Sequence, residues 1–146
     1  KCLTMQASSI LQGVLFSSLL LAASYTDIKR REIPDTVCVL LVLTGFLKFS
    51  FQNLLGIFIA LPFLIAAMFK EKSIGGGDIK LTATVGFVLG FWKGIYGLII
   101  GLTLLIFFYI ILRISSIIRK KQVVKNLSMP LAPFLGIGFL IIYFIN

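Results

Sequence analysis

The sequence contains no histidine among its 146 residues. Catalytic triads with an imidazole base, and zinc sites of the His-Glu-x-x-His type, are therefore excluded. The two cysteines, Cys2 and Cys38, do not form a Cys-x-x-Cys pair, so the sequence predicts neither a zinc ribbon nor a disulfide framework. We expect no metal and no cofactor. A hydrolase built from this sequence has to work with carboxylates, lysine or serine.

Charged residues are scarce as well. They make up 13% of the chain, against about 25% in soluble domains, whereas 59% of the residues are hydrophobic and the mean hydropathy is +1.08. The sequence therefore predicts an all-α membrane protein, a bundle of about six transmembrane helices that forms a single domain over residues 1–146. The net charge is +9. We attribute it to loops that orient the helices in the lipid bilayer, and we expect no nucleic-acid binding.

Six apolar segments can be read, over residues 8–25, 36–49, 54–69, 81–91, 95–112 and 131–145. The fourth is short, about 20 Å of helix against about 30 Å of hydrocarbon. The first resembles a signal peptide, but no small-residue cleavage site follows it, so we expect it to be retained. Of the 14 basic residues, 11 lie in the first, third and fifth loops or at their edges, together with all five acids. The positive-inside rule predicts that these loops are cytoplasmic.

Two of the five acids stand at the edges of apolar segments, and each opens an Asp-Ile-Lys tripeptide. Asp27 ends the first segment, and Asp78 precedes the fourth. Both edges are expected on the cytoplasmic side, so the two carboxylates can meet there. Two carboxylates close together cannot both ionise, so they can share a proton. One can then activate a water while the other protonates the scissile carbonyl.

Each of these features has a plainer interpretation. Asp27 can be a juxtamembrane acid paired with a neighbouring basic residue, and Asp78 can cap a helix. The three glycines before Asp78 can give a tight turn with positive φ or a flexible linker, and Gly86 and Gly90 can allow close helix packing. Asp35, after a proline, is expected to be the N-cap of the second span.

The last apolar segment begins with two prolines, Pro130 and Pro133. They can mark a helix start, or they can indicate irregular backbone that lines a cavity at membrane depth. The residues around them leave both interpretations open.

Together, three motifs resemble the signature of type IV prepilin peptidases and archaeal preflagellin peptidases, which are intramembrane aspartyl proteases of the Gly-x-Gly-Asp type. The motifs are Gly75-Gly76-Gly77-Asp78 with Ile79-Lys80-Leu81, Tyr25-Thr26-Asp27-Ile28-Lys29 with Arg31-Glu32-Ile33-Pro34-Asp35, and Pro130-Leu131-Ala132-Pro133-Phe134-Leu135. The resemblance implies six transmembrane helices and a catalytic pair, Asp27 and Asp78. It also implies a site shaped by the residues that flank this pair, namely Gly75, Gly77, Lys80, Pro130 and Pro133.

The resemblance further implies a function and a substrate. The expected activity is removal of the leader peptide from type IV prepilin-like precursors, at the cytoplasmic face of the cell membrane. Long members of the family add a cysteine zinc domain and N-methylate the new terminus. This chain has no Cys-x-x-Cys pair, so it is more similar to the short form, and methyltransferase activity is not expected. Leaders are commonly basic, so Glu32, Asp35 and Glu71 are candidates to contact the leader.

Two other functions remain open. One is a different Gly-x-Gly-Asp intramembrane protease. The other is a small transporter or channel that uses the two aspartates as a proton relay. A relay usually places its acids at mid-span, whereas both aspartates stand at the ends of apolar segments.

Overall fold

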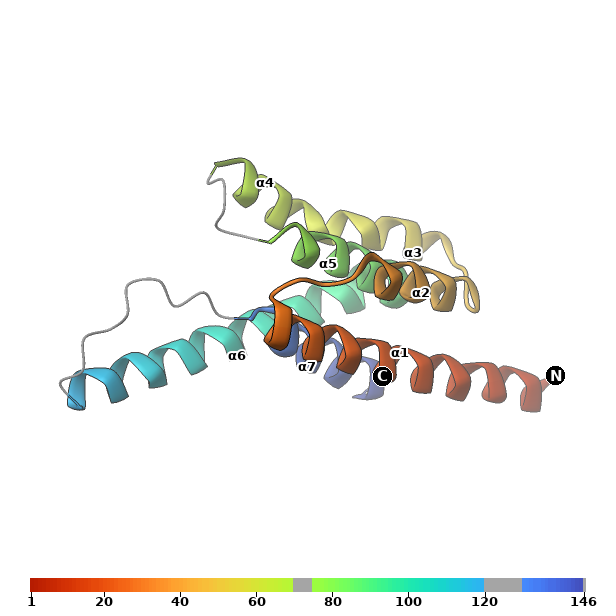
Figure 1. The fold of residues 1–146 in the computed structure, drawn as a ribbon. Helices are drawn as coiled ribbons and strands as arrows, with labels where there is room; N and C mark the ends of the chain where they lie inside the picture. Colours follow the sequence, from red (N-terminus) through yellow and green to blue (C-terminus); the bar gives the residue numbers. More distant parts are fainter. Residues whose placement is uncertain (70–74, 120–129, 146) are drawn as a thin grey trace.

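The computed structural model describes residues 1–69, 75–119 and 130–145, and within these ranges every regular element is a helix (Figure 1). The helical stretches correspond one to one to the six predicted segments. They are α1 (Cys2–Arg30), α2 (Asp35–Phe46), the continuous run α3 (Phe51–Gly56), η1 (Ile57–Ala60) and α4 (Leu61–Phe69), then α5 (Gly76–Leu89), α6 (Phe91–Ile118) and α7 (Ala132–Ile145). The prediction of an all-α protein is confirmed.

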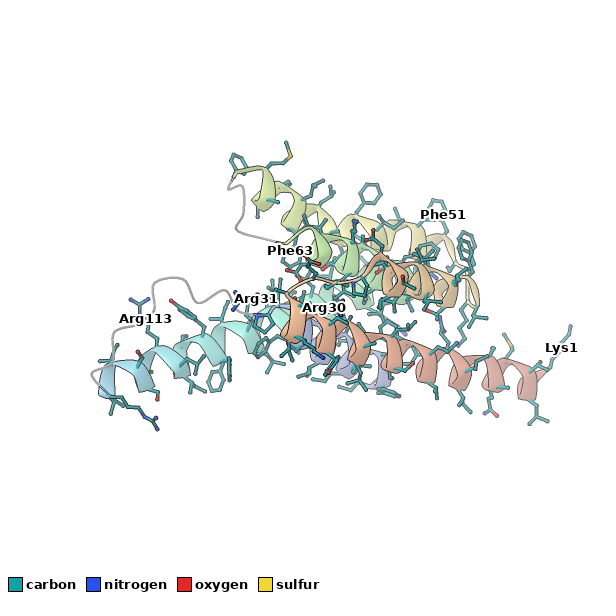
Figure 2. All side chains as sticks on the ribbon, in the orientation of Figure 1. Lys1, Arg30, Arg31, Phe51, Phe63 and Arg113 are labelled. Carbon is teal, nitrogen blue, oxygen red and sulfur yellow. The ribbon has the colours of Figure 1, made fainter. Side chains whose placement is uncertain are left out.

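The helices also fit a membrane. Three stretches are long and apolar enough to cross one, namely α1, the run from Phe51 to Phe69, and α6, whereas α2 and α7 are shorter apolar helices. Figure 2 shows many side chains that project outward from the helices. Large apolar residues that a soluble protein would bury are exposed, among them Val14, Phe107 and Ile118. An apolar exterior of this extent is stable in lipid but not in water. The chain is therefore a multi-pass membrane protein.

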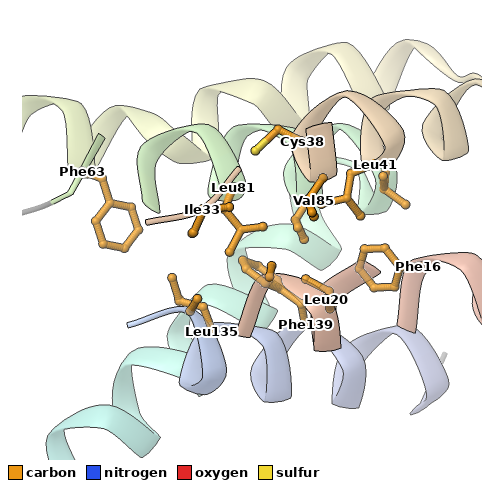
Figure 3. Close-up of a cluster of buried hydrophobic side chains, with 14 residues drawn as sticks. Phe16, Leu20, Ile33, Cys38, Leu41, Phe63, Leu81, Val85, Leu135 and Phe139 are labelled. Atoms are coloured by element: carbon orange, nitrogen blue, oxygen red, sulfur yellow. The ribbon is translucent and has the colours of Figure 1, made fainter. Parts of the chain in front are cut away.

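The core lies where α1, α2, α5 and α7 meet. Figure 3 shows its side chains turned toward one another, with Phe16 and Leu20 from α1, Leu41 from α2, Leu81 and Val85 from α5, and Leu135 and Phe139 from α7. These side chains are almost fully buried. The core therefore packs α1 against α5 and α7. The polar motifs lie at the end of α1 and at the starts of α5 and α7, so the same packing holds these three helix ends in place.

Glycines set the closest helix contacts. A Cβ on Gly86 of α5 would run into the backbone of Gly56, and a Cβ on Gly138 of α7 would run into the backbone of Gly97 and Gly101 in α6. Small residues let membrane helices approach in this way. The packing expected of Gly86 is therefore observed. Gly90 ends α5 with φ of 83°, and its backbone also lies close to Gly56, where an added Cβ would be 3.1 Å from the Gly90 carbonyl carbon.

Candidate active site

A cavity of about 330 Å³ lies where the end of α1, the connection to α2 and the start of α5 meet. Four of the five acids of the chain line it, and two basic residues face them. They are Asp27, Glu32, Asp35 and Asp78, with Arg31 and Lys80. Acids are costly in a chain this apolar, so their convergence on one cavity marks it as the candidate site.

Asp27 is held on α1 one turn before the helix ends. Arg31 follows in the left-handed conformation, and its N–H donates to the carbonyl oxygen of Asp27. The Asp27 side chain is buried, with 6% of its surface exposed, and its Oδ2 accepts a hydrogen bond of 3.0 Å from the backbone N–H of Ala132. A burial this deep distinguishes Asp27 from an ordinary solvated juxtamembrane acid.

The donor to Asp27 is the first residue of α7. The N-terminus of a helix carries unpaired N–H groups and partial positive charge, so it stabilises a carboxylate. Pro133, the second residue, has no N–H, and the N–H of Leu135 bonds to the carbonyl of Leu131. The first turn of α7 therefore presents the Ala132 N–H to Asp27.

Asp78 has different surroundings. It lies in the first turn of α5, ahead of the apolar segment that begins at Leu81, and its N–H donates to the carbonyl of Gly75. Its Oδ1 is buried and has no hydrogen-bond partner among the described residues. Burial, and after it the charge of Asp27, raises the pKa of Asp78 to about 6, while a backbone hydrogen bond from Gly75 opposes the shift. The neutral form of this carboxyl is therefore favoured far more than in water.

None of the three glycines before Asp78 has an unusual backbone angle, and one of them, Gly77, allows a close contact between segments. Gly75 is the N-cap of α5 with extended backbone, and Gly76 and Gly77 are already helical, so Asp78 is not the cap residue. Within residues 75–119 and the other described ranges, Gly90 is the only glycine with positive φ. A Cβ on Gly77 would lie 3.1 Å from the Cβ of Ile33 and 3.3 Å from its nitrogen. Gly77 thus lets the α1–α2 connection pack onto the start of α5.

The prediction that Asp35 caps α2 is wrong. Pro34 is the N-cap residue, without a side-chain cap bond, and Asp35 is the first helical residue. Its Oδ1 instead lies 2.8 Å from the Nζ of Lys80. Because both side chains are largely exposed, this ion pair adds little stability. It does connect the start of α2 to the start of α5, on either side of the cavity.

The other predicted residues are placed as follows. Pro130 lies just before α7 and Pro133 in its first turn, so the prolines mark a helix start. Glu32 lines the cavity and is exposed, while Glu71 lies outside the described residues.

The Ala132 N–H was not predicted, because a backbone donor leaves no side-chain signature in a sequence. Within the described ranges, no three His, Cys, Asp or Glu side chains are grouped so that they could hold a metal ion.

Comparison with known proteins identifies one family and two relatives. Residues 14–118, which include both aspartates but not Pro130 and Pro133, match the model of the type IV leader peptidase family. A prepilin leader peptidase/N-methyltransferase from Bacillus subtilis is 28% identical over 147 positions, which cover 90% of this chain and 54% of the relative. The prepilin peptidase EppA of Methanococcus maripaludis is 38% identical over 77 positions, which cover 49% of this chain and 21% of the relative. The chain thus spans about half the length of the Bacillus relative. No solved structure matches it.

Proposed function

The chain belongs to the type IV leader peptidase family, and on that premise we propose that it is an aspartyl endopeptidase that removes the leader from type IV prepilin-like precursors. The observation that carries the proposal is the cavity that Asp27 and Asp78 line together. Both acids lie at helix ends rather than at mid-span, which favours a protease over a proton relay. We propose that residues 1–146 act as one membrane domain, with the site facing the cytoplasm as the basic loops predict.

The two acids take different roles in this proposal. Asp27 is placed to accept a proton, because its Oδ2 already accepts a hydrogen bond from the Ala132 N–H at the start of α7. Asp78 holds the shared proton, because its buried oxygen has no described donor and its neighbour is negative. Asp27 is therefore the base that takes a proton from water, and Asp78 is the acid that protonates the carbonyl oxygen of the leader.

The peptide bond is then broken in two steps. The oxygen of the water forms a bond to the carbonyl carbon, which gives a neutral tetrahedral intermediate with Asp27 protonated and Asp78 ionised. In the second step Asp27 gives its proton to the leaving nitrogen, Asp78 regains its proton from a hydroxyl of the intermediate, and the carbon–nitrogen bond breaks. The two carboxyls return to their starting states. All of the proton transfers use groups of this chain, and the sequence supplies no Cys-x-x-Cys pair, so we propose peptidase activity without N-methyl transfer.

Co-expression with a candidate prepilin tests the proposal. Asp27→Asn keeps an oxygen for the Ala132 N–H but cannot act as a base, and Asp78→Asn cannot hold the proton. We expect each to lower the rate of leader removal at least roughly a thousandfold, within the range of general acid–base catalysis.

Lys29→Gln is the matched control, because it also removes one charge, two residues from Asp27 and outside the cavity. It should leave cleavage near the parental rate. Parental cleavage by either asparagine variant, with the variant intact in the membrane, would overturn the assignment of the two aspartates.

A further inference from the structure

A second cavity, of about 790 Å³, lies at the opposite end of the bundle from the two aspartates. The first cavity lies at the end of α1 and the starts of α2 and α5. The second is lined by residues 9–21 on one face of α1, by Lys48 just after α2, by Leu89 at the end of α5 and by Tyr143 near the end of α7. Lys93, in the first turn of α6, completes it.

The two lysines stand out from the charge pattern of the chain. Of the 14 basic residues, only Lys1, Lys48 and Lys93 lie outside the three loops that the sequence predicts to be cytoplasmic and the edges of those loops. Two of these three line the same cavity. Lys48 follows α2 and Lys93 lies in the first turn of α6, so the fold brings two lysines that are far apart in the sequence to one cavity. Two cations that meet at one cavity favour an anionic ligand.

One buried side chain lies between the two turns. Asn53 is 6% exposed, and its Nδ2 donates a hydrogen bond of 2.8 Å to the carbonyl of Lys48. Gly90, where the backbone turns into α6 with φ of 83°, lies close to the same side chain, since a Cβ added there would be 3.5 Å from the Asn53 Oδ1. Asn53 therefore binds the turn that carries Lys48 and lies beside the turn that precedes Lys93.

The rest of the cavity is amphipathic. Ile10, Val14 and Leu21 recur at helical spacing along one face of α1, so they form an apolar strip of about 16 Å. Polar groups gather near its outer end, where the Tyr143 hydroxyl donates to the carbonyl of Ser9. A ligand that fits has an anionic head for the lysines and an apolar chain for the strip.

We propose that this cavity binds one anionic phospholipid of the bilayer. Its phosphate lies between Lys48 and Lys93, which bind it as point charges, and one acyl chain follows the α1 strip. The second acyl chain stays in the bilayer. The site is separate from the aspartate cavity and does not depend on the peptidase activity.

The single tryptophan of the chain reports on this site. Trp92 precedes Lys93 and is largely exposed. The chain is placed in nanodiscs of a zwitterionic phospholipid that contain a small fraction of a brominated lipid, which quenches tryptophan fluorescence at short range. We expect brominated phosphatidylglycerol to quench more strongly than brominated phosphatidylcholine at the same mole fraction.

Lys48→Gln with Lys93→Gln should weaken the apparent affinity for the anionic lipid roughly tenfold or more, as expected when two lysines near a membrane surface are lost.

Arg113→Gln with Arg119→Gln removes the same charge from residues outside the cavity and should keep the preference. Ser17→Phe keeps both lysines but fills the strip, so it should also weaken quenching. It serves as a second test if the lysine variant folds poorly. Equal quenching by the two lipids in the unmodified chain, or an unchanged preference in both cavity variants, overturns the proposal. Reversal of the quenching by inorganic phosphate would also overturn it, because the site would then bind free anions rather than lipid.

Discussion

Asp27 and Asp78 have the same side chain, and their neighbours give them different chemistry. Asp27 receives a hydrogen bond from the start of a helix, whereas Asp78 has a buried oxygen without a described partner. A hydrogen bond to the ionised form of a carboxyl favours ionisation, whereas burial and a negatively charged neighbour favour the neutral form. When environments separate two carboxyls in this way, acid and base can be assigned to them. The first two predictions test each half of this assignment.

The first prediction concerns the proton on Asp78. The pKa of Asp78 is raised to about 6, and as the acid it has to be protonated. The active fraction therefore falls as pH rises through this value, and kcat/KM for leader removal should drop roughly fiftyfold from pH 6 to pH 8. Initial rates with a detergent-solubilised prepilin measure this, with circular dichroism at each pH as a check on folding. A rate that stays constant from pH 6 to pH 8 would contradict the role of Asp78 as the acid.

The second prediction concerns the backbone donor to Asp27. Replacing alanine 132 by lactic acid in cell-free synthesis exchanges the amide for an ester and removes only the N–H. A hydrogen bond to a charged group contributes about 1.5–3 kcal/mol. We therefore expect kcat to fall roughly ten- to a hundredfold, with little change in KM. Ala132→Gly keeps the N–H and is the control. Equal kcat for the ester and the parent would mean that Asp27 does not depend on this contact.

At the scale of helices, the crossing of the third helical run over α5 positions the start of α5. The 3-10 turn Ile57–Ala60 interrupts this run directly after Gly56, which lies against Gly86. Because α5 has only 14 residues, a shift at Gly86 is transmitted to Asp78 at the other end of the same helix. The packing of Gly56 against Gly86 therefore affects the position of Asp78 in the candidate site.

The third prediction tests this crossing. Gly86→Ala places a methyl group where the Gly56 backbone lies, so the helices have to separate. Overpacking of this kind costs about 1–3 kcal/mol, and the midpoint of thermal unfolding in detergent should fall by several degrees. Gly76→Ala is the matched control for stability, since no atom lies within 4 Å of the added Cβ. An unchanged midpoint for Gly86→Ala would show that the crossing is looser than described.

The sequence predicts the helices well but not their limits. Apolar runs show where a helix lies in the membrane, yet α1 continues to Arg30 and α5 begins at Gly76, among polar residues and glycines. Glycine is a poor helix former, so local propensity places these residues in a loop, whereas packing of Gly77 against Ile33 favours the helix. Likewise, a proline before Asp35 suggested a cap, but the nearby Lys80 binds its carboxylate. Such outcomes depend on contacts between distant residues, which periodicity does not show.

For the whole molecule, the two ends of the bundle differ in charge. Figure 2 shows Lys1 at one end of α1 and Arg30 and Arg31 at the other. The aspartate cavity lies at the second end, with acids and basic residues together, and the opposite end carries the cavity with Lys48 and Lys93. The membrane has to lie between these ends. If one end faces the cytoplasm, the other end therefore faces the opposite side of the membrane.

The fourth prediction is that the end with Asp27 and Asp78 faces the cytoplasm. Positively charged loops are retained on that side during insertion, and the first, third and fifth loops with their edges hold 11 of the 14 basic residues, with Asp27 at the edge of the first loop and Asp78 at the edge of the third. With Cys2 and Cys38 replaced by serine, single cysteines at Ser50→Cys and Lys29→Cys report on the two ends, because both positions are exposed. In intact spheroplasts, a membrane-impermeant maleimide should label the cysteine at position 50 at once. The cysteine at position 29 should react only after the membrane is permeabilised. Since leader removal has to occur where the precursor's leader lies, the reverse pattern would place the cavity on the wrong side for a cytoplasmic leader and contradict the proposed function.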